Sequence, residues 1–259
     1  MKAQSVGGRA ATEIGARSLQ RRPGMATTRS ELATPALRTV PARTTHREPR
    51  ARRVLNIVVA AAGIVLALPV MLAIAVLTKL TSRGPVLFTQ LRVGLDRRAL
   101  SRAAGNTRRH LDVGGRPFVM YKFRTMHCHD RAAAPQVWAR PGDPRITLVG
   151  RFLRSCRLDE LPQLFNVLKG DMNVVGPRPE QPAIVVQLRE QVEGYQRRQR
   201  VRPGITGWAQ INLPYDRSID DVRRKVELDL EYIRRQSGTE DLRIMLRTLP
   251  VMLFRHGGW

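Results

Sequence analysis

The stretch that organises this chain is Arg154-Ser155-Cys156-Arg157-Leu158-Asp159-Glu160-Leu161-Pro162-Gln163-Leu164-Phe165-Asn166-Val167-Leu168-Lys169-Gly170. From Leu161 to Leu168 the apolar side chains recur at three- and four-residue intervals, which is the spacing of one helical face. Pro162 suits a first helical turn, where its missing N–H costs nothing. Gly170 is typical of a residue that ends a helix. The stretch therefore predicts a short helix that begins just after two adjacent carboxylates.

Those carboxylates, Asp159 and Glu160, would lie where the helix dipole favours negative charge and free backbone amides can hold a phosphate. Arg154 and Arg178 are near the pair in sequence, and guanidinium groups match phosphate oxygens well. This combination favours phosphoryl chemistry. An ordinary acidic first turn, which is common at helix starts, is the competing interpretation of the same residues.

The composition restricts the partners of the chain. Its 259 residues carry 45 Lys and Arg against 21 Asp and Glu, a net charge of +24. Such a balance indicates an anionic partner: nucleic acid, an acidic membrane surface or phosphorylated substrates. Aromatic residues make up only 5% of the chain, which argues against stacking platforms for single-stranded nucleic acid. The two cysteines favour reduced thiols in a cytoplasmic compartment over a disulfide scaffold.

The first part of the chain divides into an arm and a membrane element. We expect residues 1–50 to be a disordered basic arm and residues 51–82 to form a membrane helix. The apolar run within 51–82 is long enough to cross a bilayer at about 1.5 Å per residue. However, Pro69 lies near its middle and should break or kink the helix. Both flanks are basic, which favours a helix that dips in and returns over a spanning helix.

A small antiparallel hairpin should follow. Residues 86–93 and 118–125 are strand-like, with many β-branched and aromatic side chains. Strand alternation puts Lys122 and Arg124 on one face, which suits a phosphate site or an exposed polar face. The polar segment between the strands, residues 96–113, is expected to be an extended loop.

The remainder is mainly helical. Helices are expected at residues 148–156, 182–200 and 216–236, the last with Val222, Val226, Leu230 and Ile233 facing inward. A constrained loop should occupy 201–210. Basic residues among bulky apolar ones at the C-terminus indicate an interfacial amphipathic helix, with packing on the protein's own core as the alternative. The tract His127–Asp130 lacks the separated ligand pairs of structural zinc sites. The fold class is thus α+β, mainly helical.

With these pieces in order, the chain resembles the bacterial sugar transferase family, the monotopic phosphoglycosyl transferases that begin exopolysaccharide, capsule and O-antigen repeat units. The resemblance runs from about Arg53 to the C-terminus. The motifs that carry it are Tyr121-Lys122-Phe123-Arg124-Thr125-Met126, Asp143-Pro144-Arg145-Ile146-Thr147, Leu158-Asp159-Glu160-Leu161-Pro162-Gln163-Leu164, Asn166-Val167-Leu168-Lys169-Gly170-Asp171-Met172, Val175-Gly176-Pro177-Arg178-Pro179-Glu180 and Arg202-Pro203-Gly204-Ile205-Thr206-Gly207-Trp208-Ala209-Gln210.

The resemblance implies a monotopic protein of the bacterial inner membrane, held in the lipid bilayer by a re-entrant helix broken at Pro69. It implies a catalytic domain over residues 83–259 on the cytoplasmic face. The implied reaction transfers a sugar 1-phosphate from a nucleotide-sugar, usually a UDP-sugar, to undecaprenyl phosphate and releases UMP. A homo-oligomer is compatible with this, and no nucleic-acid partner is expected.

The resemblance also assigns roles. Asp159 would be the nucleophile that carries the phosphosugar, and Glu160 would help to hold Mg²⁺. Arg154 and Arg178 would clamp phosphate oxygens, and Lys122 and Arg124 are further candidates for the same site.

The chain departs from the family pattern at three places. Arg157 replaces a hydroxyl residue that would cap the helix, Leu68 replaces the usual Ser before the membrane proline, and residues 96–113 are an insertion. The tail from Gln210-Ile211-Asn212 onward favours the exopolysaccharide-type branch.

The competing function is a non-catalytic, basic membrane-attached scaffold or a nucleic-acid-binding protein. It accounts for the charge but not for adjacent acids among arginines, because carboxylates repel a nucleic-acid backbone. No residue of the sequence identifies the sugar.

Overall fold

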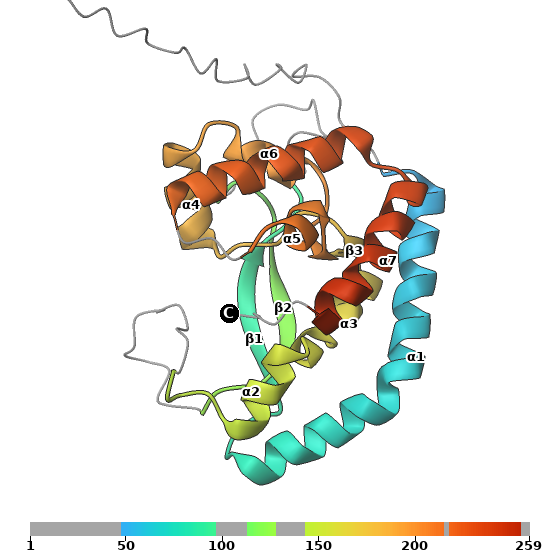
Figure 1. Ribbon diagram of the computed structural model, residues 1–259, viewed down its shortest axis with the longest axis vertical. Coiled ribbons are helices and arrows are strands. Elements are labelled where there is room, and N and C mark those ends of the chain that lie inside the picture. Colours follow the sequence, from blue (N-terminus) through green and yellow to red (C-terminus); the bar gives the residue numbers. More distant parts are fainter. Residues whose placement is uncertain (1–47, 97–112, 128–142, 215–217, 255–259) are drawn as a thin grey trace, which may run out of the picture. The chain divides into compact units, whose positions relative to one another are not determined.

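The computed structural model describes residues 48–96, 113–127, 143–214 and 218–254. The chain divides into two units, Met1–Arg43 and Thr44–Trp259, and all described residues belong to the second. Residues 1–47 of the arm expected over 1–50, most of the inserted loop and the tract after His127 lie outside the described residues. Within the described part, helices and two small sheets (Figure 1) confirm the α+β, mainly helical class.

Helix α1, Arg50–Thr81, is the long apolar element expected near the N-terminus. By length and composition it is the one helix, among the residues searched, that could cross a membrane. Its buried positions, Arg52, Asn56, Ala60, Met71, Ile74 and Thr78, recur at helical spacing and face the rest of the protein, while most other side chains are exposed. The helix remains continuous through Pro69, and Figure 1 shows a pronounced bend. The expected break is therefore a bend, as proline commonly produces.

The hairpin expected after the membrane helix is confirmed. Strands β1, Leu87–Val93, and β2, Pro117–Phe123, pair antiparallel, with Leu87 opposite Phe123 and Val93 opposite Pro117. Asn166 attaches this hairpin to the next helix. Its side chain donates to Val119 O and accepts from Tyr121 N, so it extends the edge of β2 as a further strand residue would.

The organising stretch folds into three short helices: α2 at Leu148–Ser155, the 3₁₀ turn η2 at Leu158–Glu160, and α3 at Gln163–Lys169. Gly170 ends α3 in the left-handed conformation, with φ 85°, as expected. The acidic pair lies in η2, one turn before α3, because the chain changes direction at Arg157, which has φ 54°.

The later chain contains elements that the sequence did not predict. Strands β3, Asn173–Val175, and β4, Gly204–Thr206, form a parallel pair, and α5, Trp208–Asn212, follows at once. The helix expected over 182–200 is divided into α4, Pro182–Gln191, and the 3₁₀ helix η3, Tyr195–Arg200. Gly194, between them, has φ 76°, which a continuous helix cannot accommodate.

Helix α6, Ile219–Arg235, buries the four apolar residues expected to face inward and begins with a Ser218–Asp221 capping box. Helix α7, Gly238–Phe254, also packs inward, since Asp241 and Ile244 are buried. The main apolar core joins β3, α4, α6 and α7. A second cluster, around Phe118, Met120, Val167 and Met172, fills the space between the hairpin, α1 and α3.

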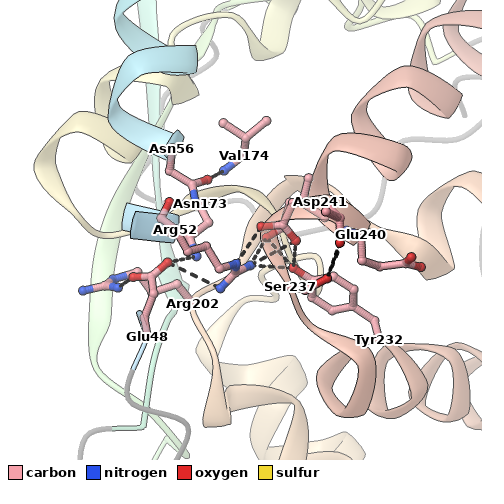
Figure 2. Close-up of polar contacts among 12 residues, drawn as sticks. Glu48, Arg52, Asn56, Asn173, Val174, Arg202, Tyr232, Ser237, Glu240 and Asp241 are labelled. Atoms are coloured by element: carbon pink, nitrogen blue, oxygen red, sulfur yellow. Dashed lines mark hydrogen bonds and ion pairs between the residues drawn. The ribbon is translucent and has the colours of Figure 1, made fainter. Parts of the chain in front are cut away.

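A buried polar junction attaches the beginning of α1 to this core (Figure 2). Arg52 Nε donates to Asp241 Oδ2 at 2.6 Å, and its Nη2 donates to the Tyr232 hydroxyl at 2.6 Å and to Val175 O at 3.3 Å. Asn56, one turn later, accepts from Val174 N at 2.7 Å. The membrane helix is thereby joined directly to β3, whose next residues lead to Arg178.

Candidate active site

Two adjacent carboxylates form the centre of the site. Asp159 and Glu160 occupy η2 and are 8% and 7% exposed. Arg157 precedes them in a left-handed conformation and caps nothing with its side chain. The turn therefore forms without a side-chain cap, and its backbone bonds include Glu160 N to Arg157 O at 3.1 Å. The turn presents both carboxylates beside β2.

Glu160 gathers two cations on one oxygen. Its Oε1 accepts from Lys122 Nζ at 2.8 Å and from Arg178 Nη2 at 2.7 Å. Lys122 comes from β2, and Arg178 from the loop after β3. Burial alone would raise the pKa of the Glu160 carboxyl, but the Arg178 and Lys122 charges and their hydrogen bonds hold it well below its usual range. Glu160 is therefore an anion that assembles the cationic part of the site.

Asp159 has the opposite environment. Its nearest described cation is Lys122, with Nζ 3.7 Å from Oδ2, beyond hydrogen-bond distance. Burial raises its pKa, and the neighbouring Glu160 charge adds to this rise, while Lys122, Arg178 and Arg154 oppose it. A desolvated carboxylate that no strong hydrogen bond engages retains its lone pairs for attack on an electrophile. Pairs of acids with opposite pKa shifts are typical of catalytic sites.

Arg154, in the last turn of α2, is the third cation of this group. It lowers the pKa of Asp159, after burial and the contributions of Lys122, Glu160 and Arg178. It also contributes to the pKa of Asp143, which falls to about 2 mainly because Arg145 donates hydrogen bonds to that carboxylate. The structure thus places Lys122 and Arg178 beside the acidic pair, and the charge of Arg154 acts on Asp159.

Arg124 is located elsewhere. It is buried, and its Nη2 donates to Thr78 O at 3.2 Å and to Ser82 O at 2.6 Å, at the carboxyl end of α1. These described contacts hold Arg124 at the end of α1, and its role in the phosphate site stays a prediction. A cation at a helix C-terminus interacts favourably with the helix dipole.

Two residues that support Arg178 were not recognised as site residues. Gln210, in α5, accepts from Arg178 Nη1 at 3.1 Å, and Arg198, in η3, donates to the Arg178 carbonyl at 3.1 Å. Gln210 ends the last motif of the family resemblance, which was the available signal. No local pattern indicated that it lies beside Arg178, 32 residues earlier in the chain.

The carboxylates fit a divalent cation in one respect. The hydrogen bonds of Glu160 from Lys122 and Arg178 both fall on Oε1, and the bonds described for this side chain leave Oε2 for a metal. No group of three or more His, Cys, Asp or Glu suitable for a metal occurs among the residues searched. Mg²⁺ is commonly bound by one or two carboxylates together with substrate phosphates. Glu160 Oε2 could therefore contribute to binding a divalent cation together with substrate phosphates.

The arrangement combines a buried carboxylate, a second carboxylate that holds Lys122 and Arg178, and a third cation at the end of α2. Such a set can bind a diphosphate and stabilise the charge that develops when a phosphoryl group is transferred. The apolar helix α1 lies against α3, where Leu164 packs beside Gly63. The helix that follows the acidic pair is therefore packed on the long apolar helix.

Comparison with known proteins agrees with this chemistry. The family model described as "Bacterial sugar transferase" matches residues 47–255. The chain is 43% identical, over 80% of its length, to the UDP-N-acetylgalactosamine-undecaprenyl-phosphate N-acetylgalactosaminephosphotransferase of Aeromonas hydrophila. It is 41% identical, over 76% and 78% of its length, to UDP-glucose:undecaprenyl-phosphate glucose-1-phosphate transferases of Escherichia coli and Caulobacter vibrioides.

The matched region differs in extent among these relatives. It spans 44% of the Aeromonas protein, 39% of the Escherichia coli protein and 69% of the Caulobacter protein. The match to this chain is continuous and contains the acidic pair, the hairpin and the loop of Arg178. The chain therefore belongs to the bacterial sugar transferase family.

Proposed function

We propose that this protein transfers a sugar 1-phosphate from a UDP-sugar to undecaprenyl phosphate, the step that initiates synthesis of an exopolysaccharide or related polymer. The observation that carries the proposal is the contrast within the acidic pair. Lys122 and Arg178 donate hydrogen bonds to Glu160, whereas Asp159 is buried beside them and accepts no strong hydrogen bond from the residues that the structure describes. The names of the relatives specify this donor and acceptor for those proteins.

In the first step, an oxygen of the Asp159 carboxylate attacks the β-phosphorus of the UDP-sugar. The bond between that phosphorus and the bridging oxygen breaks, UMP leaves with the bonding electrons, and the phosphosugar remains on Asp159. In the second step, a phosphate oxygen of the lipid attacks the same phosphorus and displaces the carboxylate. The product is a diphosphate-linked lipid sugar, and Asp159 is regenerated.

The cations act on the charge that moves during these steps. Arg178 and Arg154 bind phosphate oxygens, and Lys122 lies between the two carboxylates, where it can stabilise both the nucleophile and the bound phosphate. Mg²⁺ held by Glu160 would neutralise the diphosphate and favour departure of the nucleotide. The expected requirement for Mg²⁺ follows from the diphosphate of the proposed UDP-sugar donor.

We further propose that α1 is re-entrant and that the acidic pair lies at the cytoplasmic headgroup layer. The bend in α1 and its exposed apolar side chains support this arrangement. Other exposed apolar residues lie on α2, α3 and α7: Leu148, Phe152, Phe165, Leu168, Leu242, Leu246 and Leu249. On α7 they recur at helical spacing, as in helices that lie in a membrane interface.

Release of UMP tests the reaction. Purified protein with Mg²⁺, undecaprenyl phosphate and a panel of UDP-sugars should release UMP with at least one donor, and Asp159→Asn should lower the rate by a factor on the order of a thousand. Asp220→Asn is the matched control, because that carboxylate is 79% exposed and pairs only with Arg223 among the described residues. UMP release that survives in Asp159→Asn would refute the nucleophile, and release from no donor would refute the reaction.

Cysteine labelling tests the topology. In a cysteine-free background, Arg50→Cys and Pro85→Cys flank α1, and a re-entrant helix keeps both positions on the same side. A membrane-impermeant maleimide added to intact spheroplasts should label neither, and should label both after lysis. Labelling of one position alone in intact spheroplasts would identify a spanning helix.

A further inference from the structure

Gln210 contacts the arginine that faces the acidic pair. Its Oε1 accepts from Arg178 Nη1 at 3.1 Å, while Arg178 Nη2 donates to Glu160 Oε1 at 2.7 Å. The two terminal nitrogens of one guanidinium are thus bound by different elements, α5 and η2. Because a guanidinium is a rigid planar fork, contacts on both terminal nitrogens fix the orientation of its plane as well as its position.

The backbone of Arg178 is held independently. Arg198 Nη2 donates to the Arg178 carbonyl at 3.1 Å, and Arg198 is itself anchored by Asp229, with Nε 2.6 Å from Oδ2. Both members of this ion pair are almost completely buried. Gly204 N also donates to the neighbouring Pro177 carbonyl at 3.0 Å. With the loop fixed in this way, the remaining freedom of Arg178 is in its side-chain torsions.

Those torsions need a restraint. The Arg178 side chain is 25% exposed, and a long cationic side chain carries about 2 kcal/mol of rotamer entropy when it is free to move. Glu160 binds Arg178 through Oε1 alone, and that oxygen also accepts from Lys122, so Glu160 fixes the position of Arg178 Nη2 but restrains the guanidinium plane less. The Gln210 carbonyl provides a second contact, at Nη1, that restrains the plane.

The amide of Gln210 is not placed there for packing. Its Nε2 is buried and has no hydrogen-bond partner among the described residues, and an unsatisfied buried donor costs about 1–3 kcal/mol. An apolar side chain of similar size would avoid that cost. Groups of this kind in native proteins call for a functional explanation, and the contact from Gln210 Oε1 to Arg178 provides one.

We propose that Gln210 is a positioning residue that orients the Arg178 guanidinium toward the phosphate held beside Asp159 and Glu160. The inference rests on the proposed function, in which Arg178 binds phosphate oxygens of the donor. Orientation fixed before the substrate arrives lowers the barrier of the chemical step more than it improves binding. Loss of Gln210 should therefore lower kcat and leave KM for the UDP-sugar nearly unchanged.

A double-mutant cycle between Gln210→Leu and Arg178→Ala tests this inference. Gln210→Leu should lower kcat for UMP release roughly 10-fold, with an unchanged or higher Tm, because an unsatisfied buried donor has been removed. In the Arg178→Ala background the same change should alter kcat less than about twofold, since interacting residues are not additive. Asn212→Leu, on the exposed side of α5, is the matched control and should have no effect.

Equal losses of kcat with and without Arg178, or a Tm that falls together with kcat, would overturn the proposal. A second measurement does not depend on activity. In protein labelled with ¹⁵N-arginine and assigned with Arg178→Lys, the Arg178 guanidinium should rotate slowly, and Gln210→Leu should speed that rotation. Unchanged rotation would reject the positioning role. Absence of UMP release from the unmodified protein would reject the proposed function instead.

Discussion

At the scale of single residues, the two neighbouring carboxylates differ because of which atoms reach them. Glu160 Oε1 accepts hydrogen bonds from two charged side chains, whereas the pKa of Asp159 is set mainly by burial of its carboxyl group. The pKa of Asp159 is raised and that of Glu160 is lowered, which is the division expected if Glu160 stays an anion and Asp159 is the reactive group, as we propose. Their identical charge in the sequence conceals this difference.

The pH dependence of activity should report the pKa of Asp159. Its folded pKa is raised, chiefly by burial, so the ionised form that the proposed mechanism requires is lost as pH falls through a value above 3.8. Lys122 opposes that rise. Lys122→Gln should therefore move the acidic limb of the kcat/KM profile to higher pH, in addition to lowering the rate. The profile of UMP release against pH is the measurement.

The control for this shift is Lys169→Gln. Lys169 pairs with the Tyr121 hydroxyl at 2.7 Å, and its charge is not among those that act on Asp159. The acidic limb of the Lys169→Gln activity profile should coincide with that of the unmodified protein. An acidic limb of Lys122→Gln that stays in place or moves downward would contradict the assignment.

At the scale of secondary structure elements, α2 supports the site by contact between backbones. An ideal Cβ at Gly150 would lie 2.0 Å from Thr125 O, in the segment that follows β2. Only glycine permits this approach, and Thr147 caps the same turn by accepting from Gly150 N at 2.8 Å. Arg154 lies one turn further along α2, so its position depends on that contact.

Gly150→Ala should displace α2 and reduce both stability and activity. Overpacking of this kind costs about 1–3 kcal/mol, and the displacement moves Arg154 relative to Asp159. Thermal unfolding and UMP release are the measurements. Gly238→Ala is the matched control, because a Cβ there would meet its nearest atom, Leu55 Cδ2, at an ordinary 3.9 Å. Equal tolerance of both substitutions would show that α2 can move without consequence.

At the scale of the whole molecule, a buried polar junction connects the membrane helix to the catalytic part. Figure 2 shows Arg52 beside Asp241, while Asn56 receives the amide of Val174. Arg52 also donates to Val175 O, at the end of β3. The loop that carries Arg178 follows this strand, so the position of α1 and the position of the site are fixed together.

Asp241→Leu should destabilise the protein by up to about 3–5 kcal/mol, because it removes the closer of the two carboxylates that pair with the buried Arg52 guanidinium and leaves only Glu48, at 3.4 Å, among the described residues. The double substitution Arg52→Met with Asp241→Leu should recover much of this loss, since replacing both partners removes the uncompensated charge. Denaturant or thermal unfolding in detergent measures both. A double variant no more stable than Asp241→Leu would show that the junction is held by other contacts.

The sequence by itself determined the features that depend on neighbours along the chain. Apolar spacing predicted the inward face of α6, and Gly170 predicted the end of α3. Strand composition predicted the hairpin. The acidic pair could be identified from the sequence because arginines lie near it in the chain.

The tertiary structure decided what depends on residues far apart in the chain. It joined Gln210 and Arg198 to Arg178, moved Arg124 to the end of α1, and paired β3 with β4. Three-residue strands carry too little periodicity to predict, and a polar side chain does not reveal its distant partner, because that partner is selected by the packing of elements rather than by local sequence.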